Sequence, residues 1–100
     1  MGLKEVRETE TYKAWFSRLA DRRAKARIDI RIKRLAMGNY GDVKPVGMGI
    51  SELRIDYGPG YRVYFKETGT EIIVLLCGGD KRTQAGDIER AKKLLRDLEA

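Results

Sequence analysis

Residues 61–82 constrain the fold of this chain more than any other stretch. They open with an alternation that is typical of a strand with one buried face, in which Tyr61, Val63 and Phe65 alternate with Arg62, Tyr64 and Lys66. Residues 68–70 have glycine at their centre and predict a turn. Residues 72–77 are an unbroken apolar run, which favours a central strand covered on both faces. The stretch therefore predicts a hairpin in the middle of a sheet.

The dipeptide at 78–79 is Gly-Gly and predicts the end of the second strand of this hairpin. Asp80 is the expected N-cap of a helix that follows directly. Arg62 is predicted to leave the sheet on the face away from the core, and Lys81 and Arg82 stand at the end of the next strand. We therefore expect these three cations to meet on one side of the sheet.

A pair of antiparallel helices is predicted between residues 9 and 38. Thr9 and Asp21 are the expected N-caps, and Gly38 is the expected residue just beyond the second helix. Apolar side chains recur at the helical period and are expected to fill the core, namely Tyr12, Trp15, Phe16 and Leu19, then Ala24, Ile28, Ile32 and Leu35. The second helix is also strongly basic, and its cations either form a solvated face or follow the phosphates of a nucleic acid.

The remaining segments complete an α+β domain. Residues 3–8 are predicted to form an opening strand. Residues 43–46 read as extended, and their proline favours an edge position or a loose segment. From residue 50 the alternation resumes, and a final helix carries the apolar stripe Ile88, Ala91, Leu95 and Leu98. The predicted order is β-α-α-β-β-β-α, an antiparallel sheet packed by the helical hairpin and the last helix, in a single domain over residues 1–100.

The overall charge and composition narrow the range of partners and chemistries. Lys and Arg number 21 against 15 Asp and Glu, and this formal net charge of +6 favours a polyanion such as nucleic acid. The chain has no His and one Cys, which argues against imidazole catalysis, a zinc site and an internal disulfide, so no cofactor is expected. No apolar run approaches the roughly 20 residues of a membrane helix, and the start shows no signal-peptide pattern. We expect a cytoplasmic protein without membrane contact.

Several motifs carry a resemblance to a known family. They are ELRIDYGPGYRVYF, LLCGGDKRTQ and DIERAK, and the segments KPVGMGISELRI and RIKRLAMGNYGD fit the same pattern. In these motifs and in its order of elements, the chain resembles the RelE/ParE toxin superfamily over essentially its whole length. Within the superfamily it is most similar to the HigB-like, phage-related addiction module killer proteins. The resemblance implies a toxin of a type II toxin–antitoxin system, neutralised by a cognate antitoxin that is commonly a helix-turn-helix protein encoded adjacently.

The resemblance also implies an activity and a set of site residues. Relatives of the RNA-cleaving kind are metal-independent endoribonucleases (mRNA interferases) that cut messenger RNA on the ribosome and so inhibit translation. Because the ribose 2′-OH attacks the adjacent phosphate, preorganised cations must stabilise the phosphate charge. Arg62 and Arg82 match the arginines of ribonuclease-active relatives, and Arg54 stands where relatives carry Lys or Arg. Lys81 is a weaker candidate, and Lys66 is weaker still.

The proton acceptor of such a reaction is not assigned by the resemblance. Relatives often place Tyr or His in or just before the last helix, where this chain has Asp87 and Ile88. Glu52, Asp56 and Tyr64 are the substitutes that the sequence offers. Two alternatives to the nuclease stay open: a ParE-like inhibitor of DNA gyrase that cuts no RNA, and an inactive relative that only binds its antitoxin.

Overall fold

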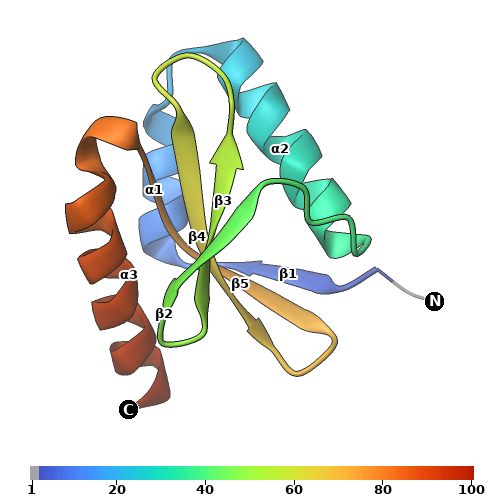
Figure 1. Cartoon of the computed structure of the whole chain (residues 1–100), viewed down its shortest axis with the longest axis vertical. Coiled ribbons are helices and arrows are strands. Elements are labelled where there is room, and N and C mark those ends of the chain that lie inside the picture. Colours follow the sequence, from blue (N-terminus) through green and yellow to red (C-terminus); the bar gives the residue numbers. More distant parts are fainter. Residues whose placement is uncertain (1–2) are drawn as a thin grey trace.

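A mixed β-sheet between two helical layers forms the fold (Figure 1). The computed structural model describes residues 3–100. In chain order these residues form β1 (Glu5–Glu8), α1 (Glu10–Arg18), α2 (Arg22–Ala36), β2 (Val43–Gly47), β3 (Ile50–Ile55), β4 (Tyr61–Thr68), β5 (Ile72–Asp80), a 3-10 turn (Lys81–Thr83) and α3 (Gln84–Glu99). The strands lie side by side in the order β1-β5-β4-β3-β2. In the described part of the chain, no helix is both long and apolar enough to cross a membrane.

The first strand makes the sheet mixed, where the sequence predicted an antiparallel one. β1 pairs parallel with β5, whereas the other neighbouring strands run antiparallel. β2 adds an edge strand with an irregularity between Pro45 and Gly47, so the predicted β-α-α-β-β-β-α order is one strand short. Local sequence does not report the parallel pairing, because β1 finds its partner near the other end of the chain. The edge position of the extended segment at 43–46 was predicted from Pro45 and is confirmed.

The helix boundaries follow the predicted capping residues. Thr9 Oγ1 accepts a hydrogen bond of 3.0 Å from the backbone N–H of Tyr12. Asp21 Oδ1 accepts from two backbone N–H groups in the first turn of α2. Gly38 follows α2 with a φ of +92°, a left-handed conformation that glycine adopts without strain. The predicted starts of both helices and the predicted end of α2 are confirmed.

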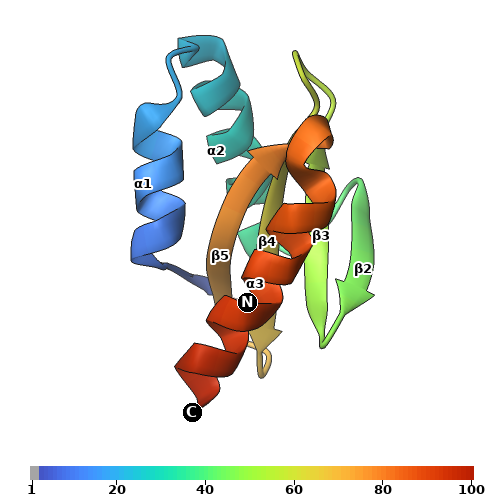
Figure 2. The same ribbon diagram turned by 90° about the vertical axis from the view of Figure 1, so that its left-hand side faces the viewer.

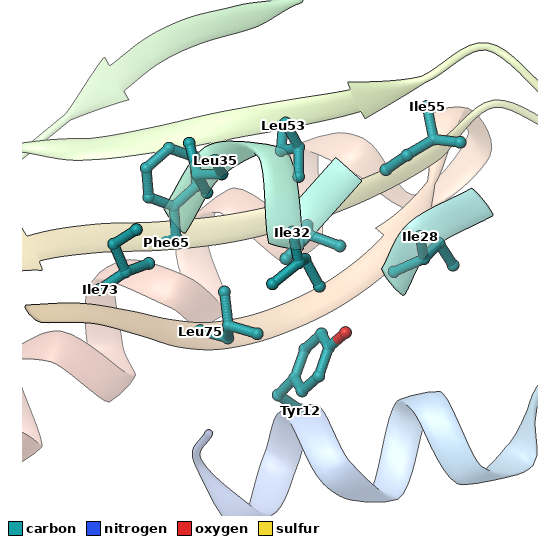
Figure 3. Close-up of a cluster of buried hydrophobic side chains, with 10 residues drawn as sticks. Tyr12, Ile28, Ile32, Leu35, Leu53, Ile55, Phe65, Ile73 and Leu75 are labelled. Atoms are coloured by element: carbon teal, nitrogen blue, oxygen red, sulfur yellow. The ribbon is translucent and has the colours of Figure 1, made fainter. Parts of the chain in front are cut away.

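Each face of the sheet has its own hydrophobic core. The larger core lies under α1 and α2 (Figure 3) and contains Tyr12, Ile28, Ile32, Leu35, Leu53, Ile55, Val63, Phe65, Ile73 and Leu75. The smaller core lies under α3 and contains Ile50, Tyr64, Leu76, Cys77, Ala91 and Leu95. Figure 2 shows α1 and α2 together and α3 apart from them. The face that carries Arg62 is therefore partly covered by α3. Leu98 was predicted to belong to the apolar stripe of α3, but it is 58% exposed at the end of the helix.

Gly78 and Gly79 belong to β5 and do not end it. A Cβ atom on Gly78 would lie 2.3 Å from the Trp15 ring, and a Cβ atom on Gly79 would lie 1.8 Å from Oδ2 of Asp87. These two glycines therefore allow α1 and α3 to approach the strand closely. The prediction that the dipeptide ends the strand was wrong. Glycine also occurs inside strands where a neighbouring element packs so closely that a side chain would not fit.

Candidate functional site

Arg54 and Arg62 face each other on neighbouring strands. The register pairs Arg54 of β3 with Arg62 of β4, close to the turn that joins these strands. Like charges directly opposite each other destabilise a sheet, so the pair requires a compensating group. Both arginines line a hollow of about 380 Å³, which we call the arginine hollow. Its lining residues are Asp42, Arg54, Ile55, Asp56, Gly58, Pro59, Gly60, Arg62 and Lys81.

Glu52 is the buried counter-ion of the two arginines, and its carboxylate lies out of reach of solvent. Oε1 accepts a hydrogen bond of 2.9 Å from Nε of Arg54 and lies 3.8 Å from Nε of Arg62, an ion pair too long for a hydrogen bond. Oε2 accepts from the Tyr64 hydroxyl at 3.0 Å and from the Gln84 amide at 2.7 Å. One buried carboxylate thus serves two guanidinium groups.

The protonation of this cluster follows from burial and partners together. Burial alone would raise the pKa of Glu52, but hydrogen bonds from Gln84, Arg54 and Tyr64 and the charge of Arg62 outweigh burial and lower it. Burial, reinforced by the hydrogen bond to Glu52, raises the pKa of the Tyr64 phenol. Glu52 is therefore ionised with both oxygens engaged, and Tyr64 keeps its proton. The sequence offered both as proton acceptors; in the structure they instead hold the arginines in place.

The Arg62 side chain is 11% exposed, yet its hydrogen-bonding capacity is not filled. Nη1 donates to the backbone carbonyls of Gly60 and Tyr61 at 3.2 and 3.4 Å. Within residues 3–100, the buried Nε has no hydrogen-bond partner. This Nε faces Glu52, while the guanidinium as a whole lines the hollow, where its charge attracts an anionic ligand.

Lys81 joins the arginine hollow, whereas Arg82 does not. Both lie in the 3-10 turn after β5, and Asp80 caps this turn by accepting from the backbone N–H of Arg82 at 2.8 Å. The Arg82 side chain is 81% exposed and pairs with Asp80 Oδ2 at 3.1 Å. The predicted meeting of Arg82 with the two strand arginines does not occur, because its guanidinium pairs with the aspartate that caps the turn.

Three further positions singled out in the sequence lie away from the arginine hollow, whereas Asp56 lines it. Lys66 is opposite Ile50, at the far end of the β3–β4 pair. Asp87 is buried on α3 and accepts a hydrogen bond from the Thr83 hydroxyl, and Ile88 packs against the smaller core. In the described part of the chain, none of these three side chains lines the arginine hollow.

Three residues that the sequence did not single out as site residues contribute to the site. Gln84 holds Glu52 from the first turn of α3, and Asp42 lines the arginine hollow. Arg31 of α2 donates from Nη1 to the carbonyl of Arg54, and from Nη2 at 3.4 Å to carbonyls of the loop before β2. Local patterns do not mark these residues, because their partners lie on distant elements.

The arginine hollow brings together cations and accessible carboxylates. Arg54, Arg62 and Lys81 supply positive charge, and Asp42 and Asp56 are exposed in the same wall. Within residues 3–100, no group of three or more His, Cys, Asp or Glu side chains could hold a metal ion. Such a hollow can bind a phosphate diester through its cations and place a carboxylate next to it.

Known proteins resemble the chain in sequence and in fold, although no protein-family model matches it. An uncharacterised protein from Haemophilus influenzae is 53% identical over 94 residues, which cover 94% of this chain and 95% of that protein. The solved toxin–antitoxin complex RelBE2 from Mycobacterium tuberculosis contains a chain that matches with a TM-score of 0.62 at 20% identity, over 80% of this chain and 100% of that one. The chain therefore belongs to the same family as the H. influenzae protein and has an α+β fold of the RelE type.

Proposed function

We propose that this chain is the toxin of a type II toxin–antitoxin pair and that it cuts messenger RNA without a metal ion. The fold that it shares with a chain of the RelBE2 complex supports the role of a toxin with an antitoxin partner. The facing arginines Arg54 and Arg62 carry the proposal, because they share one buried carboxylate and both line the arginine hollow. An RNA phosphate is a ligand whose charge and acceptor oxygens suit two neighbouring guanidinium groups. On its sequence motifs we place the chain in the HigB-like branch, with a helix-turn-helix antitoxin, ribosome-bound mRNA as substrate and the cytoplasm as its place of action.

The chemistry is an attack of a ribose 2′-OH on the adjacent phosphorus. The hydroxyl proton passes to a base, and the new P–O2′ bond closes a cyclic phosphate. The P–O5′ bond breaks, and the leaving 5′-oxygen takes up a proton from water. Arg54, Arg62 and Lys81 stabilise the charge that develops on the phosphate oxygens. Cations that are already in place need no rearrangement at the moment of reaction, and Glu52 keeps the two arginines in place.

Asp56 is our candidate for the proton acceptor. It follows β3 directly, is exposed and lines the arginine hollow with Arg54 and Arg62. We expect Asp56→Asn to bind RNA at least as tightly as the native chain, because a negative charge is removed beside the phosphate. Cleavage should fall by about 100-fold or more, the usual contribution of a positioned base. Asp42→Asn, in the same wall, is the matched control, and equal activity of Asp56→Asn and the native chain would rule out this role.

Expression in cells tests the proposal as a whole. We would induce the gene with and without its adjacent reading frame, and map RNA 5′ ends. The native chain should arrest growth and produce RNA ends at defined codon positions, and the adjacent gene should suppress both effects. Arg54→Gln and Arg62→Gln should relieve both, whereas Arg90→Gln on the exposed side of α3 should not. Thermal unfolding of each purified variant separates loss of the site from loss of the fold.

A second function has one observation in its favour. Glu52 and Tyr64 are sealed from solvent, so two groups that could handle the proton do not reach a substrate. An inhibitor of DNA gyrase that cuts no RNA needs no such group. Mapping of gyrase cleavage in the same induced cells distinguishes the two functions, since trapped, broken DNA without new RNA ends supports the gyrase inhibitor. An inactive relative that only binds its antitoxin would leave growth unchanged.

A further inference from the structure

We propose that the RNA strand held at the arginine hollow continues onto α2, where a second hollow binds the neighbouring part of the strand. This second hollow, which we call the α2 hollow, has a volume of about 280 Å³. Its lining residues are Arg27, Ile30, Arg31, Arg34, Ile55 and Asp56. The inference rests on the proposed function and adds a binding site for the same class of substrate, single-stranded RNA.

The two hollows are contiguous on the surface. Ile55 and Asp56, at the end of β3, line both of them. Arg31 fixes α2 against this strand end, because its guanidinium donates to the backbone carbonyls of Arg54 and Asp42. An extended ligand that leaves one hollow across residues 55–56 therefore enters the other. The hydrogen bonds of Arg31 therefore fix the position of one hollow relative to the other.

The charge of the α2 hollow suits a polyanion. Its three arginines stand against one aspartate, Asp56. Arg31 uses its donors on backbone carbonyls and so acts as a positioning residue. Arg27 and Arg34 are exposed, and neither forms an ion pair within residues 3–100. These two guanidinium groups are therefore available to phosphates that follow the one held at the arginine hollow.

Flat and apolar surfaces beside these arginines favour nucleotides over a merely acidic peptide. Ile30 is 47% exposed between the arginines of α2. The Arg27 guanidinium lies 4.6 Å from the ring centroid of Tyr57, whose hydroxyl donates to Asp21 at 3.0 Å and is thereby fixed. Unpaired bases stack on aromatic rings and guanidinium planes, and this stacking is available in a single strand but not in a duplex.

Binding measurements with RNA of two lengths test this site. The probes are fluorescein-labelled 2′-O-methyl oligouridylates of about four and about ten nucleotides, which cannot be cut because the 2′-OH is blocked. The native chain should bind the longer probe about tenfold more tightly. Arg27→Ala/Arg34→Ala should bind the short probe as the native chain does and lose the gain from length. Its salt dependence on the long probe should weaken by about 0.7 in log–log slope for each arginine removed.

The control removes the same charge elsewhere. Arg90 and Lys93 are exposed on α3, which forms the other helical layer (Figure 2). Arg90→Ala/Lys93→Ala should keep the gain from length. An equal loss in both double variants would mean general attraction to a basic protein and would overturn the site. The site is also overturned if the native chain gains nothing from length, or if a decaglutamate peptide needs Arg27 and Arg34 while RNA does not. Failure of the arginine hollow shows separately, as unchanged short-probe binding in Arg62→Gln.

Discussion

Glu52 of β3 accepts hydrogen bonds from three side chains although solvent does not reach it. Burial of a charge is costly unless the charge is paired, and here Arg54 and Arg62 provide that pairing. The negative charge of the carboxylate in turn offsets the repulsion between these two arginines on facing strands. The residue therefore contributes both to stability and to the orientation of the cations at the arginine hollow.

Substitution of Glu52 tests this double role. Glu52→Gln keeps the shape of the side chain but leaves two guanidinium groups opposite each other without a counter-charge. We expect the free energy of unfolding in urea to fall by roughly 3 kcal/mol, as when one partner of a buried ion pair is removed. Glu89→Gln, at a side chain that is 72% exposed on α3, should change it by less than about 0.5 kcal/mol. Equal stability of the two variants would contradict the role.

The same residue gives a pH dependence of defined sign. Because folding lowers the pKa of Glu52 below its ordinary 4.5, the unfolded chain binds more protons between the two pKa values. The contribution of Glu52 to stability is therefore complete above about 4.5 and is lost as pH falls through the folded pKa. We expect the difference in unfolding free energy between the native chain and Glu52→Gln to shrink on acidification. A difference that grows below pH 4.5 would show the opposite sign.

At the scale of elements, the approach of α3 to β5 depends on the absence of a side chain at Gly79. A Cβ atom there would also lie 2.7 Å from Cγ of Asp87 and 2.9 Å from Oγ1 of Thr83, so the helix start would have to move. We expect Gly79→Ala to destabilise the protein by about 1–3 kcal/mol, the usual cost of overpacking. Gly86→Ala is the matched control on α3 itself, since nothing lies within 4 Å of a Cβ atom there.

The control should act in the opposite direction. Gly86 lies inside α3, and alanine favours a helix over glycine by up to about 1 kcal/mol. The midpoint temperature of thermal unfolding should therefore be higher for Gly86→Ala than for the native chain, and lower for Gly79→Ala. The expectation fails if both substitutions shift the midpoint in the same direction.

The elements that the sequence predicted well are those with local signals. The caps at Thr9 and Asp21 act on backbone groups of the next turn, and the alternation in β3 and β4 puts Leu53 and Phe65 in the larger core. The pairing of β1 with β5 depends on contacts across almost the whole chain. The last helix and residues 72–77 were predicted to contribute to the core, and they do, through Ala91, Leu95, Leu76 and Cys77; the burial of Tyr64 was not predicted, because it depends on α3 packing over that face.

The candidate site divides along the same line. That Arg54 and Arg62 share a face follows from the alternation of two strands joined by a short turn. The path of the chain after β5 is not local in this sense, because the hydrogen bond from Gln84 to Glu52 joins residues 32 positions apart. Arg82 is exposed and pairs with Asp80. Sequence therefore indicated the strand half of the cation set and misplaced one of the cations that follow β5.

At the scale of the molecule, the two cores share one sheet and should unfold together. Trp15 of α1 packs over Gly78 in the larger core, whereas Leu95 of α3 fills the smaller core on the other face. We expect urea curves followed by tryptophan fluorescence and by far-UV circular dichroism to coincide, as in most small single domains. Leu95→Ala should lower the unfolding free energy by about 2–5 kcal/mol and keep the curves coincident. Separated curves would show that α3 detaches on its own.

The pairing of β1 with β5 determines when the sheet can form during synthesis on the ribosome. Residues 5–8 are made among the first, but their partners at 72–75 are made only when most of the chain already exists. Because β5 lies between β1 and β4, a nascent chain that lacks β5 leaves β1 without its partner and has no Lys81 at the arginine hollow. Only a nearly complete chain therefore acquires the whole cation set of this hollow.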